Sequence, residues 1–243
     1  MIRMFSRLSI FAISLSLMSA GLAHADKFRG LPTLDGKASK TLQARFVHYD
    51  GSTNGAMIID VKNTGKTAAA FTTEGLYFVP DGDPEKAPQR LGAGGPFVEI
   101  AKDSKSGANL TGHKNKLVIP PGQTRRLALE VFCIDSHRPS PSSDTKFSLA
   151  NKRLPKKLRR DITVGNQSIL RQNKGDVARS KSAIQSNMWE TRDRDWVKLE
   201  GERKDEKAAK THIQMQMGNQ RVRREMRNVP RQMRNNVEIQ EQQ

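Results

Sequence analysis

The chain has very little of what covalent cross-links or metal centres require. Cys133 is its single cysteine, so no disulfide can form within the chain. The five histidines are scattered, and none stands at a zinc-ligand spacing from another histidine or from a cysteine pair. We therefore expect neither a metal nor another cofactor.

Motifs of familiar enzyme classes are missing as well. There is no Gly-x-Ser-x-Gly nucleophile elbow, and no glycine-rich loop stands between a strand and a helix to bind phosphate. Ser136 and His137 are adjacent, so their side chains point apart and do not suit a catalytic pair. Cys133 and His137 would meet only if the chain turned after Asp135, and His137 is more readily explained as a loop cap. The sequence favours a protein that is not an enzyme.

Acidic residues are scarce relative to basic ones. Lysine and arginine number 42 against 25 aspartates and glutamates, which gives a formal net charge of +17 at pH 7. Such a positive field favours polyanions: anionic lipid headgroups, acidic polysaccharides, teichoic acid or lipopolysaccharide phosphates, and extracellular nucleic acid. The alternative is that the charge serves solubility and has no specific anionic partner, since charge alone carries no specificity.

A long continuous apolar run occurs only near the start of the chain. Two arginines precede the run at residues 8–18, and the small-x-small step Ala23-His24-Ala25 follows. This pattern is typical of a secretory signal peptide over residues 1–25, cleaved so that Asp26 comes first. The run is too short to cross a bilayer, and no later segment is apolar enough. We expect an exported protein without a transmembrane segment, secreted, periplasmic or held at the extracellular surface.

Residues 42–135 carry a β pattern. Their apolar or alternating stretches are separated by glycine, proline and asparagine turn signals, and lie at 42–49, 56–61, 68–73, 76–79, 97–100, 117–119 and 125–134. In the last stretch, alternation puts Leu127, Leu129, Val131 and Cys133 on one face. No helical periodicity intervenes, which favours an antiparallel β-sandwich.

Turn signals within this region carry a family resemblance. Asn63-Thr64-Gly65 follows a strand, and Pro120-Pro121-Gly122 precedes the last long strand. This order resembles the exported Ig-like β-sandwich domains of bacteria. The resemblance implies a binding scaffold and names no ligand.

The composition changes after residue 135. Proline, serine and then basic residues dominate, so we expect residues 136–175 to be a Pro/Ser and basic linker. From Asp176, a candidate helix cap, apolar residues recur on one helical face and predict a helical segment over 176–217, solvated beyond Thr191. Residues 26–41 form an N-terminal extension, and residues 218–243 a polar, partly disordered tail of low complexity. The predicted fold is mainly β with α.

Two short motifs could carry chemistry. They read Val131-Phe132-Cys133-Ile134-Asp135 and Ile184-Gln185-Ser186-Asn187-Met188-Trp189. Together they resemble the signature of the thioester domains of bacterial surface adhesins. The resemblance implies that Cys133 supplies the sulfur and Gln185 the acyl group of an internal thioester. Phe132, Met188 and Trp189 would then form the apolar shell that keeps water away.

A structural interpretation of the same motifs stays open. Cys133 alternates with other apolar residues and fits the buried face of a strand. On this interpretation Gln185 is a polar helix residue, and Trp189 anchors the helix to the sheet.

The densest basic cluster is the remaining candidate site. It consists of Lys152, Arg153, Lys156, Lys157, Arg159 and Arg160. Phosphate or sulfate groups are its natural counter-charges. No aromatic side chain is interleaved, so base stacking is not indicated. A solvated helix face or loop would have the same composition.

These observations leave three classes of function. The first is an exported, non-enzymatic binding or adhesion module at or outside the cell envelope, with an anionic polymer or envelope surface as a possible partner. The second is a covalent attachment protein with a Cys133–Gln185 thioester. The third is a structural protein of the envelope that is held there by charge. None of the three has a defined small-molecule substrate.

Overall fold

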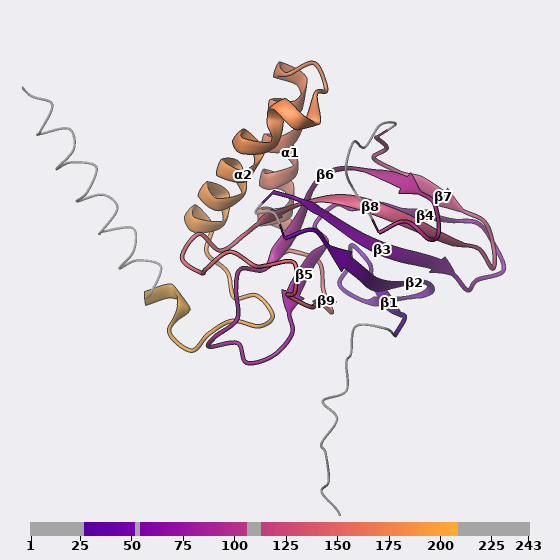
Figure 1. Cartoon of the computed structure of the whole chain (residues 1–243), viewed down its shortest axis with the longest axis horizontal. Helices are drawn as coiled ribbons and strands as arrows, with labels where there is room; N and C mark the ends of the chain where they lie inside the picture. The colour runs from indigo at the N-terminus through magenta and orange to yellow at the C-terminus, as the bar shows by residue number, and fades with distance from the viewer. Residues whose placement is uncertain (1–26, 52–53, 106–112, 209–243) are drawn as a thin grey trace, which may run out of the picture.

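The alternating stretches form the strands of an antiparallel, mainly β structure with helices packed on it (Figure 1). The computed structural model describes residues 27–51, 54–105 and 113–208. The predicted signal peptide and the predicted tail lie outside these residues. The elements are β1 Arg29–Pro32, β2 Ala38–Tyr49, β3 Ala56–Asn63, β4 Ala69–Phe71, β5 Tyr77–Pro80, β6 Leu91–Ile100, β7 Leu117–Ile119, β8 Thr124–Cys133, β9 Phe147–Leu149, α1 Lys156–Gln172 and α2 Val177–Arg194.

Most strands lie in one curved sheet. Its order is β1-β2-β3-β8-β6-β5-β9, and β4 pairs with β7 in a separate two-stranded sheet. Phe147 of β9 packs against Phe46 and Tyr49 of β2, with ring centroids 6.2 and 5.4 Å apart, so the large sheet curls until its edges approach. The mainly β fold with helices is confirmed. The Ig-like sandwich is not confirmed, because seven strands belong to a single sheet that is nearly barrel-shaped.

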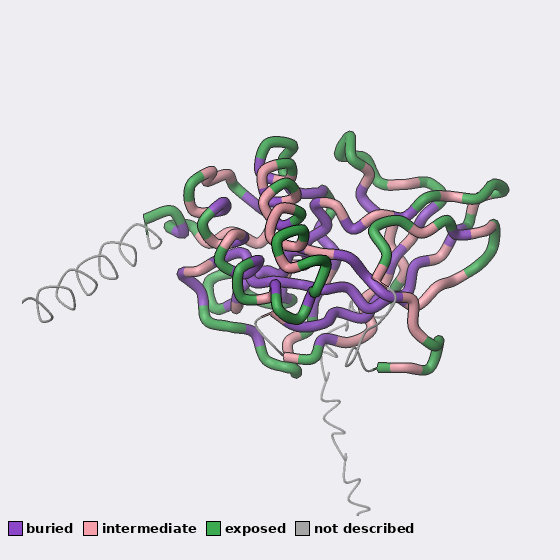
Figure 2. Tube along the Cα trace, turned by 90° about the horizontal axis from the view of Figure 1, so that it is seen from above, coloured by how far each residue is buried: buried purple, intermediate pink, exposed green. Residues whose placement is uncertain are grey.

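The two faces of β8 pack into two apolar clusters. Leu127, Leu129, Val131 and Cys133 are fully buried inside the curved sheet, as the alternation predicts. Phe132, on the opposite face, belongs to the cluster beneath the helices. Figure 2 shows this burial along the central strands, with exposed residues gathered on loops and outer helix turns. β8 is therefore the partition between the sheet interior and the helical layer.

The predicted turn after β3 does more than reverse the chain. The Asn63 side-chain oxygen accepts the N–H of Gly65 at 2.9 Å, which closes the turn. Its Nδ2 donates to the carbonyls of Thr67 and Ile119, each at 2.8 Å. The buried Asn63 side chain thus ties the end of β3 to β7.

The segment expected to be a linker, residues 136–175, contains β9 and all of α1. Leu158, Ile162 and Asn166 recur every four residues on α1 and are buried. Leu158 and Ile162 join Phe132 of β8 in the cluster under the helices. Of the basic residues between them, Arg160 faces outward and Arg159 is mostly buried, and both concealed an amphipathic helix of ordinary spacing. The N-terminal extension likewise contributes β1 and the first residues of β2.

α2 begins where the sequence predicts. Asp176 caps it by accepting the N–H of Arg179 at 3.0 Å, and Val177, Ile184 and Met188 are buried. Beyond Arg194, residues 195–208, here called the C-terminal strap, return to the sheet and bury Leu199 and Glu206. This strap replaces the solvated helix that we expected. Within the described part of the chain, no helix has the length and apolar character to cross a membrane.

The packing of α1 can be tested by truncating its buried and exposed faces. Leu158 is 1% exposed and Val164 is 57% exposed. We expect Leu158→Ala to lower the free energy of unfolding by about 3 kcal/mol, because it opens a cavity between α1 and the sheet. Val164→Ala should change it by less than about 0.5 kcal/mol. Urea titration measures both, and equal effects would contradict the docking of α1.

Candidate functional site

Cys133 and Gln185 meet at the end of β8. The last residue of β8 that pairs with β3 is Glu130, opposite Ala56, so Cys133 lies beyond the end of β3. There Gln185 of α2 takes the place of a strand. Its Oε1 accepts the Cys133 N–H at 3.0 Å, and its Nε2 donates to the Cys133 carbonyl at 2.7 Å. The side-chain amide satisfies both peptide groups of Cys133 and docks α2 on the sheet.

The hydrogen bonds between Cys133 and Gln185 use only the Cys133 backbone, and no described hydrogen bond involves the Cys133 thiol. It lies in the cluster inside the curved sheet, while Phe132 and Met188 lie in the cluster under the helices. Burial raises the pKa of the Cys133 thiol to about 12, and the charge of Asp135 adds to the increase. Trp189 packs against the sheet interior and donates its indole N–H to Gln89 at 3.0 Å. The structure brings Cys133 and Gln185 together through the Cys133 backbone, and divides the proposed apolar shell between two clusters.

The contribution of the Gln185 amide to the free energy of unfolding can be measured directly. Gln185→Leu keeps a helix-forming side chain of similar length but leaves the buried N–H and carbonyl of Cys133 without a partner. We expect a loss of about 3 kcal/mol in the free energy of unfolding. Gln167→Leu on exposed α1 surface is the matched control and should cost less than about 0.5 kcal/mol. Equal midpoints of urea unfolding for the two variants would contradict the strand-like role of Gln185.

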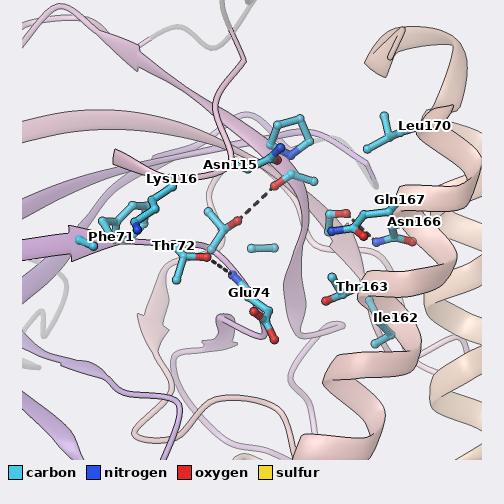
Figure 3. Close-up of a pocket in the computed structure, with 16 residues that line it drawn as sticks. Phe71, Thr72, Glu74, Asn115, Lys116, Ile162, Thr163, Asn166, Gln167 and Leu170 are labelled. Carbon is cyan, nitrogen blue, oxygen red and sulfur yellow. Dashed lines mark hydrogen bonds between the residues drawn. The ribbon is translucent and has the colours of Figure 1, made fainter. Parts of the chain in front are cut away.

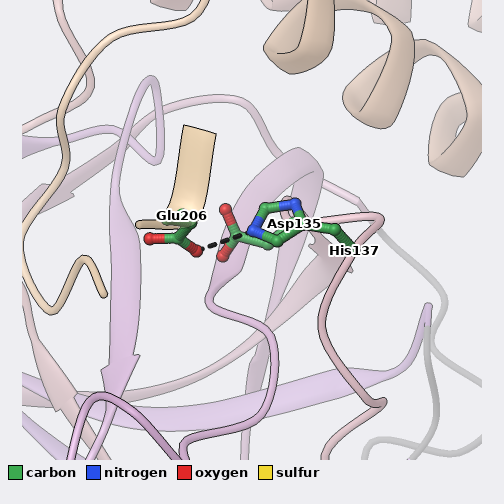
Figure 4. Close-up of side chains that lie close together, drawn as sticks. All are labelled: Asp135, His137 and Glu206. Atoms are coloured by element: carbon green, nitrogen blue, oxygen red, sulfur yellow. Dashed lines mark hydrogen bonds and ion pairs between the residues drawn. The ribbon is translucent and has the colours of Figure 1, made fainter. Parts of the chain in front are cut away.

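A cluster of buried charges lies just beyond β8 (Figure 4). The Arg90 side chain donates two hydrogen bonds to Asp135, from Nε to Oδ2 at 2.7 Å and from Nη2 to Oδ1 at 2.6 Å. Glu206 of the C-terminal strap is bound by Arg90 at 3.0 Å, by His137 at 2.8 Å and by the Nε of Arg138. The side chains of Arg90, Asp135, Arg138 and Glu206 are fully buried. Three residues from two distant segments therefore converge on the Glu206 carboxylate.

Arg192 of α2 completes this cluster differently. Its guanidinium is fully buried and lies over the Trp196 ring, 3.9 Å from the centroid. Its nitrogens lie 3.8 Å from Glu202 and 3.9 Å from Asp135, and they make no hydrogen bond to any described residue. Burial lowers the pKa of Arg192, although Asp135 opposes the change. Arg192 is held by charge and by ring stacking.

Asp135, His137 and Glu206 offer ligand atoms within 4.8 Å of one another, the arrangement of a metal site. The neighbouring guanidinium groups argue against a cation there. Arg90 already occupies both oxygens of Asp135, and Arg138 and His137 share one oxygen of Glu206 with it. A divalent ion would have to displace these bonds and sit beside buried positive charge. The donor set is better suited to holding the C-terminal strap than to holding a metal.

The carboxylates of this cluster should make stability depend on pH. Burial raises the pKa of Asp135, but the charge and hydrogen bonds of Arg90 outweigh it, so the pKa lies below its usual range. The pKa of Glu206 is also lowered, because hydrogen bonds from His137 and Arg138 outweigh burial. Lowered carboxylate pKa values contribute stability that is present above the unfolded values of about 4, and lost as pH falls through the folded values.

Glu206→Gln tests this origin of acid sensitivity. Removing the charge leaves Arg138 and His137 without their carboxylate, so we expect a loss of about 3 kcal/mol at pH 7. Below about pH 4 the wild-type protein should lose stability with falling pH more steeply than the variant. Urea unfolding between about pH 2.5 and 7 measures this. Parallel pH profiles would show that Glu206 is not a source of the dependence.

The predicted basic cluster is only partly available at the surface. Arg153 is buried and donates to the carbonyls of Pro32 at 2.7 Å, of Thr72 at 3.1 and 3.2 Å, and of Glu74. Burial lowers the pKa of Arg153 to about 10, and the charge of Arg159 contributes. Arg153 is therefore a tie between loops and not a surface ligand for polyanions.

The other members of the cluster lie nearer the solvent. Arg159 pairs with Glu74 at 3.1 Å, and Arg160 with Asp161 at 3.2 Å. Lys157 bridges Asp161 at 3.2 Å and Asp195 at 2.7 Å. Lys152 and Lys156 are exposed and form no ion pair with a described residue. Of the six cations, these two are the most accessible to an external anion.

A cleft of about 450 Å³ lies between α1 and the strands β4 and β6 (Figure 3). It exists because β6 bulges between Ala93 and Phe97, where its register with β8 shifts. Gly94 is required at the bulge, since a Cβ there would lie 2.5 Å from the Phe132 ring. Asn166 of α1 donates to the Gly94 carbonyl at 2.6 Å and thereby fixes the helix across the bulge.

Polar groups on both walls of the cleft are unused. Thr163 and Gln167, one turn apart on α1, line one wall, and Asn115 and Lys116 line the other. Their side chains make no hydrogen bond to any described residue. Sequence reasoning missed this cleft. The signal that could have found it is the Gly92-Ala93-Gly94-Gly95-Pro96 run, because glycines inside a strand favour a bulge.

Comparisons of the chain with models of known protein families, with curated proteins and with solved structures gave no match. The functional argument therefore starts from the cleft and the buried clusters themselves.

Proposed function

We propose that the chain is a non-enzymatic binding module that acts after export, at or outside the cell envelope, and that the cleft beside α1 is its binding site. The observation that carries the proposal is the unused set of hydrogen-bonding groups around about 450 Å³ of space. Ligand sites in proteins are commonly about 300–1,000 Å³ and place a few polar groups on rigid elements. Here α1 and the sheet supply these elements.

The positive charge plays a supporting part in this proposal. Without Arg3 and Arg7 of the expected signal peptide, the net charge of +17 falls by two to +15, which still attracts anionic envelope polymers from a distance. Lys152 and Lys156 are free to contact them. Such contacts are screened by salt and carry little specificity. An Ig-like affiliation also belongs to the proposal. It is supported by β3, the Asn63 turn and the long β8 lying side by side, and it would add a binding role without naming a ligand.

A covalent attachment protein is the second candidate. It is favoured by the contact between the Gln185 amide and the peptide of Cys133. A thioester would require Gln185 to leave that peptide and approach the thiol, with loss of ammonia. The intact mass of the mature chain separates the candidates, because a thioester lowers it by one ammonia and methylamine would then add at Gln185.

Filling the cleft tests the binding proposal. Gln167→Trp puts a bulky side chain on the cleft wall, and Val164→Trp puts the same side chain on exposed surface of the same helix. We expect the wild type and Val164→Trp to be retained on purified peptidoglycan or lipopolysaccharide, and Gln167→Trp to be retained at least about tenfold less. Retention is measured by cosedimentation at about 1 M salt, where the Debye length is about 3 Å.

Two results would contradict the proposal. Equal retention of both tryptophan variants would place any binding outside the cleft. Retention that disappears for all three proteins at high salt would leave only a net-charge effect. The absence of retention at every salt concentration would contradict binding to these polymers. Matching thermal unfolding curves confirm that neither tryptophan disturbs the fold.

A further inference from the structure

The charge of the cleft differs from that of the molecule around it. Among its lining residues are one base, Lys116, and one acid, Glu74, and the acid is paired with Arg159 at 3.1 Å. The whole chain carries +17. A site that had to hold a polyanion would be expected to gather arginines and lysines around the ligand. The cleft instead offers mainly neutral groups.

The available groups suit a ligand that carries hydroxyls. The Gln167 and Asn115 amides each provide a donor and an acceptor, and the Thr163 hydroxyl can serve as either. A sugar hydroxyl also donates and accepts, so each of these side chains can form a complementary pair with it. Figure 3 shows that Thr163 and Gln167 face the Asn115 side of the cleft across open space. Ala70, Pro96 and Leu170 add small apolar surfaces that can contact the C–H faces of a sugar ring.

Other ligand classes fit less well. The segment after β4 is a poor edge for an added peptide strand, because the carbonyls of Thr72 and Glu74 already receive hydrogen bonds from Arg153. An aromatic ligand would find no exposed ring to stack on. Phe71 is the one aromatic residue of the lining, and it is fully buried against Phe97, with ring centroids 5.2 Å apart.

We infer that the cleft beside α1 binds a short, neutral stretch of a polysaccharide, one or two sugar rings long. The inference rests on the proposed function and names the ligand class of the same site. Thr163 and Gln167 bind the sugar from the helix, and Asn115 binds it from the opposite wall. Few hydrogen bonds and no stacked ring give weak binding, with a dissociation constant on the order of 1 mM for a short oligosaccharide. The repeats of a polymer raise the local concentration of such stretches, and the positive charge of the chain holds the protein near them.

The test is an NMR titration of the mature full-length chain with chitotriose, maltotriose and cellotriose, and with a heparin tetrasaccharide as the anionic comparison. At about 10 mM sugar, tenfold above the expected dissociation constant, we expect at least one neutral trisaccharide to shift the signals of Asn115, Thr163 and Gln167. Gln167→Leu should weaken this binding about fivefold, the loss of one hydrogen bond. Gln172→Leu, on the same helix but outside the cleft lining, should leave it unchanged.

The possible failures are distinct. If no neutral sugar shifts the cleft signals, or the heparin fragment shifts them more, the inferred ligand class is wrong. If Gln167→Trp still abolishes retention on envelope polymer in that case, the binding site stands and only its ligand differs. If the Gln167→Trp protein is retained on the polymer as well as the Val164→Trp protein is, the proposed function itself fails.

Discussion

The arrangement of this protein depends on the buried bonds that Arg90 forms with Asp135 and Glu206. These three residues come from the start of β6, the chain just after β8, and the C-terminal strap. Arg192 of α2 lies against the same group, so the helical layer is registered to the sheet at this point. Because α1 packs on α2 and on β6, the width of the cleft follows from that register. The proposed ligand site thus depends on charges that line none of it.

Such a cluster costs desolvation energy, and its value lies in specificity more than in stability. Three guanidinium groups and their carboxylates could in principle be replaced by apolar residues of similar volume at little net cost. Apolar residues would accept several registers of the strap, whereas Glu206 satisfies Arg90, Arg138 and His137 together in only one. Gln185 acts in the same way with neutral groups, since its amide fits one peptide unit at the end of β8. The buried charge cluster and the Gln185 amide both fix the position of α2.

Local patterns in the sequence predicted the strands well because they report on local physics. Alternation identified β2 and β8, and a short apolar run identified β3. The Asn63 turn and the Asp176 cap each form the expected hydrogen bond. The failures share a cause. β1 and β9 are too short to show alternation, and α1 was concealed by basic residues between Leu158 and Ile162. The curvature of the sheet, the strap and the cleft arise from contacts between distant segments, such as Arg90 with Glu206, which no local pattern encodes.

The cleft and the surface charge work on different length scales, and this bears on how one molecule could be both adhesive and selective. The net positive charge acts over a Debye length of about 8 Å at physiological salt and attracts any anionic polymer. Hydrogen bonds from Thr163, Gln167 and Asn115 act only at contact and depend on the geometry of the ligand. Lys116 is the one base in the cleft lining, and on the first turns of α1 Arg159 is neutralised by Glu74 and Lys157 by Asp161 and Asp195. In the proposed function, long-range attraction concentrates the protein on an envelope, and the neutral groups of the cleft decide what binds.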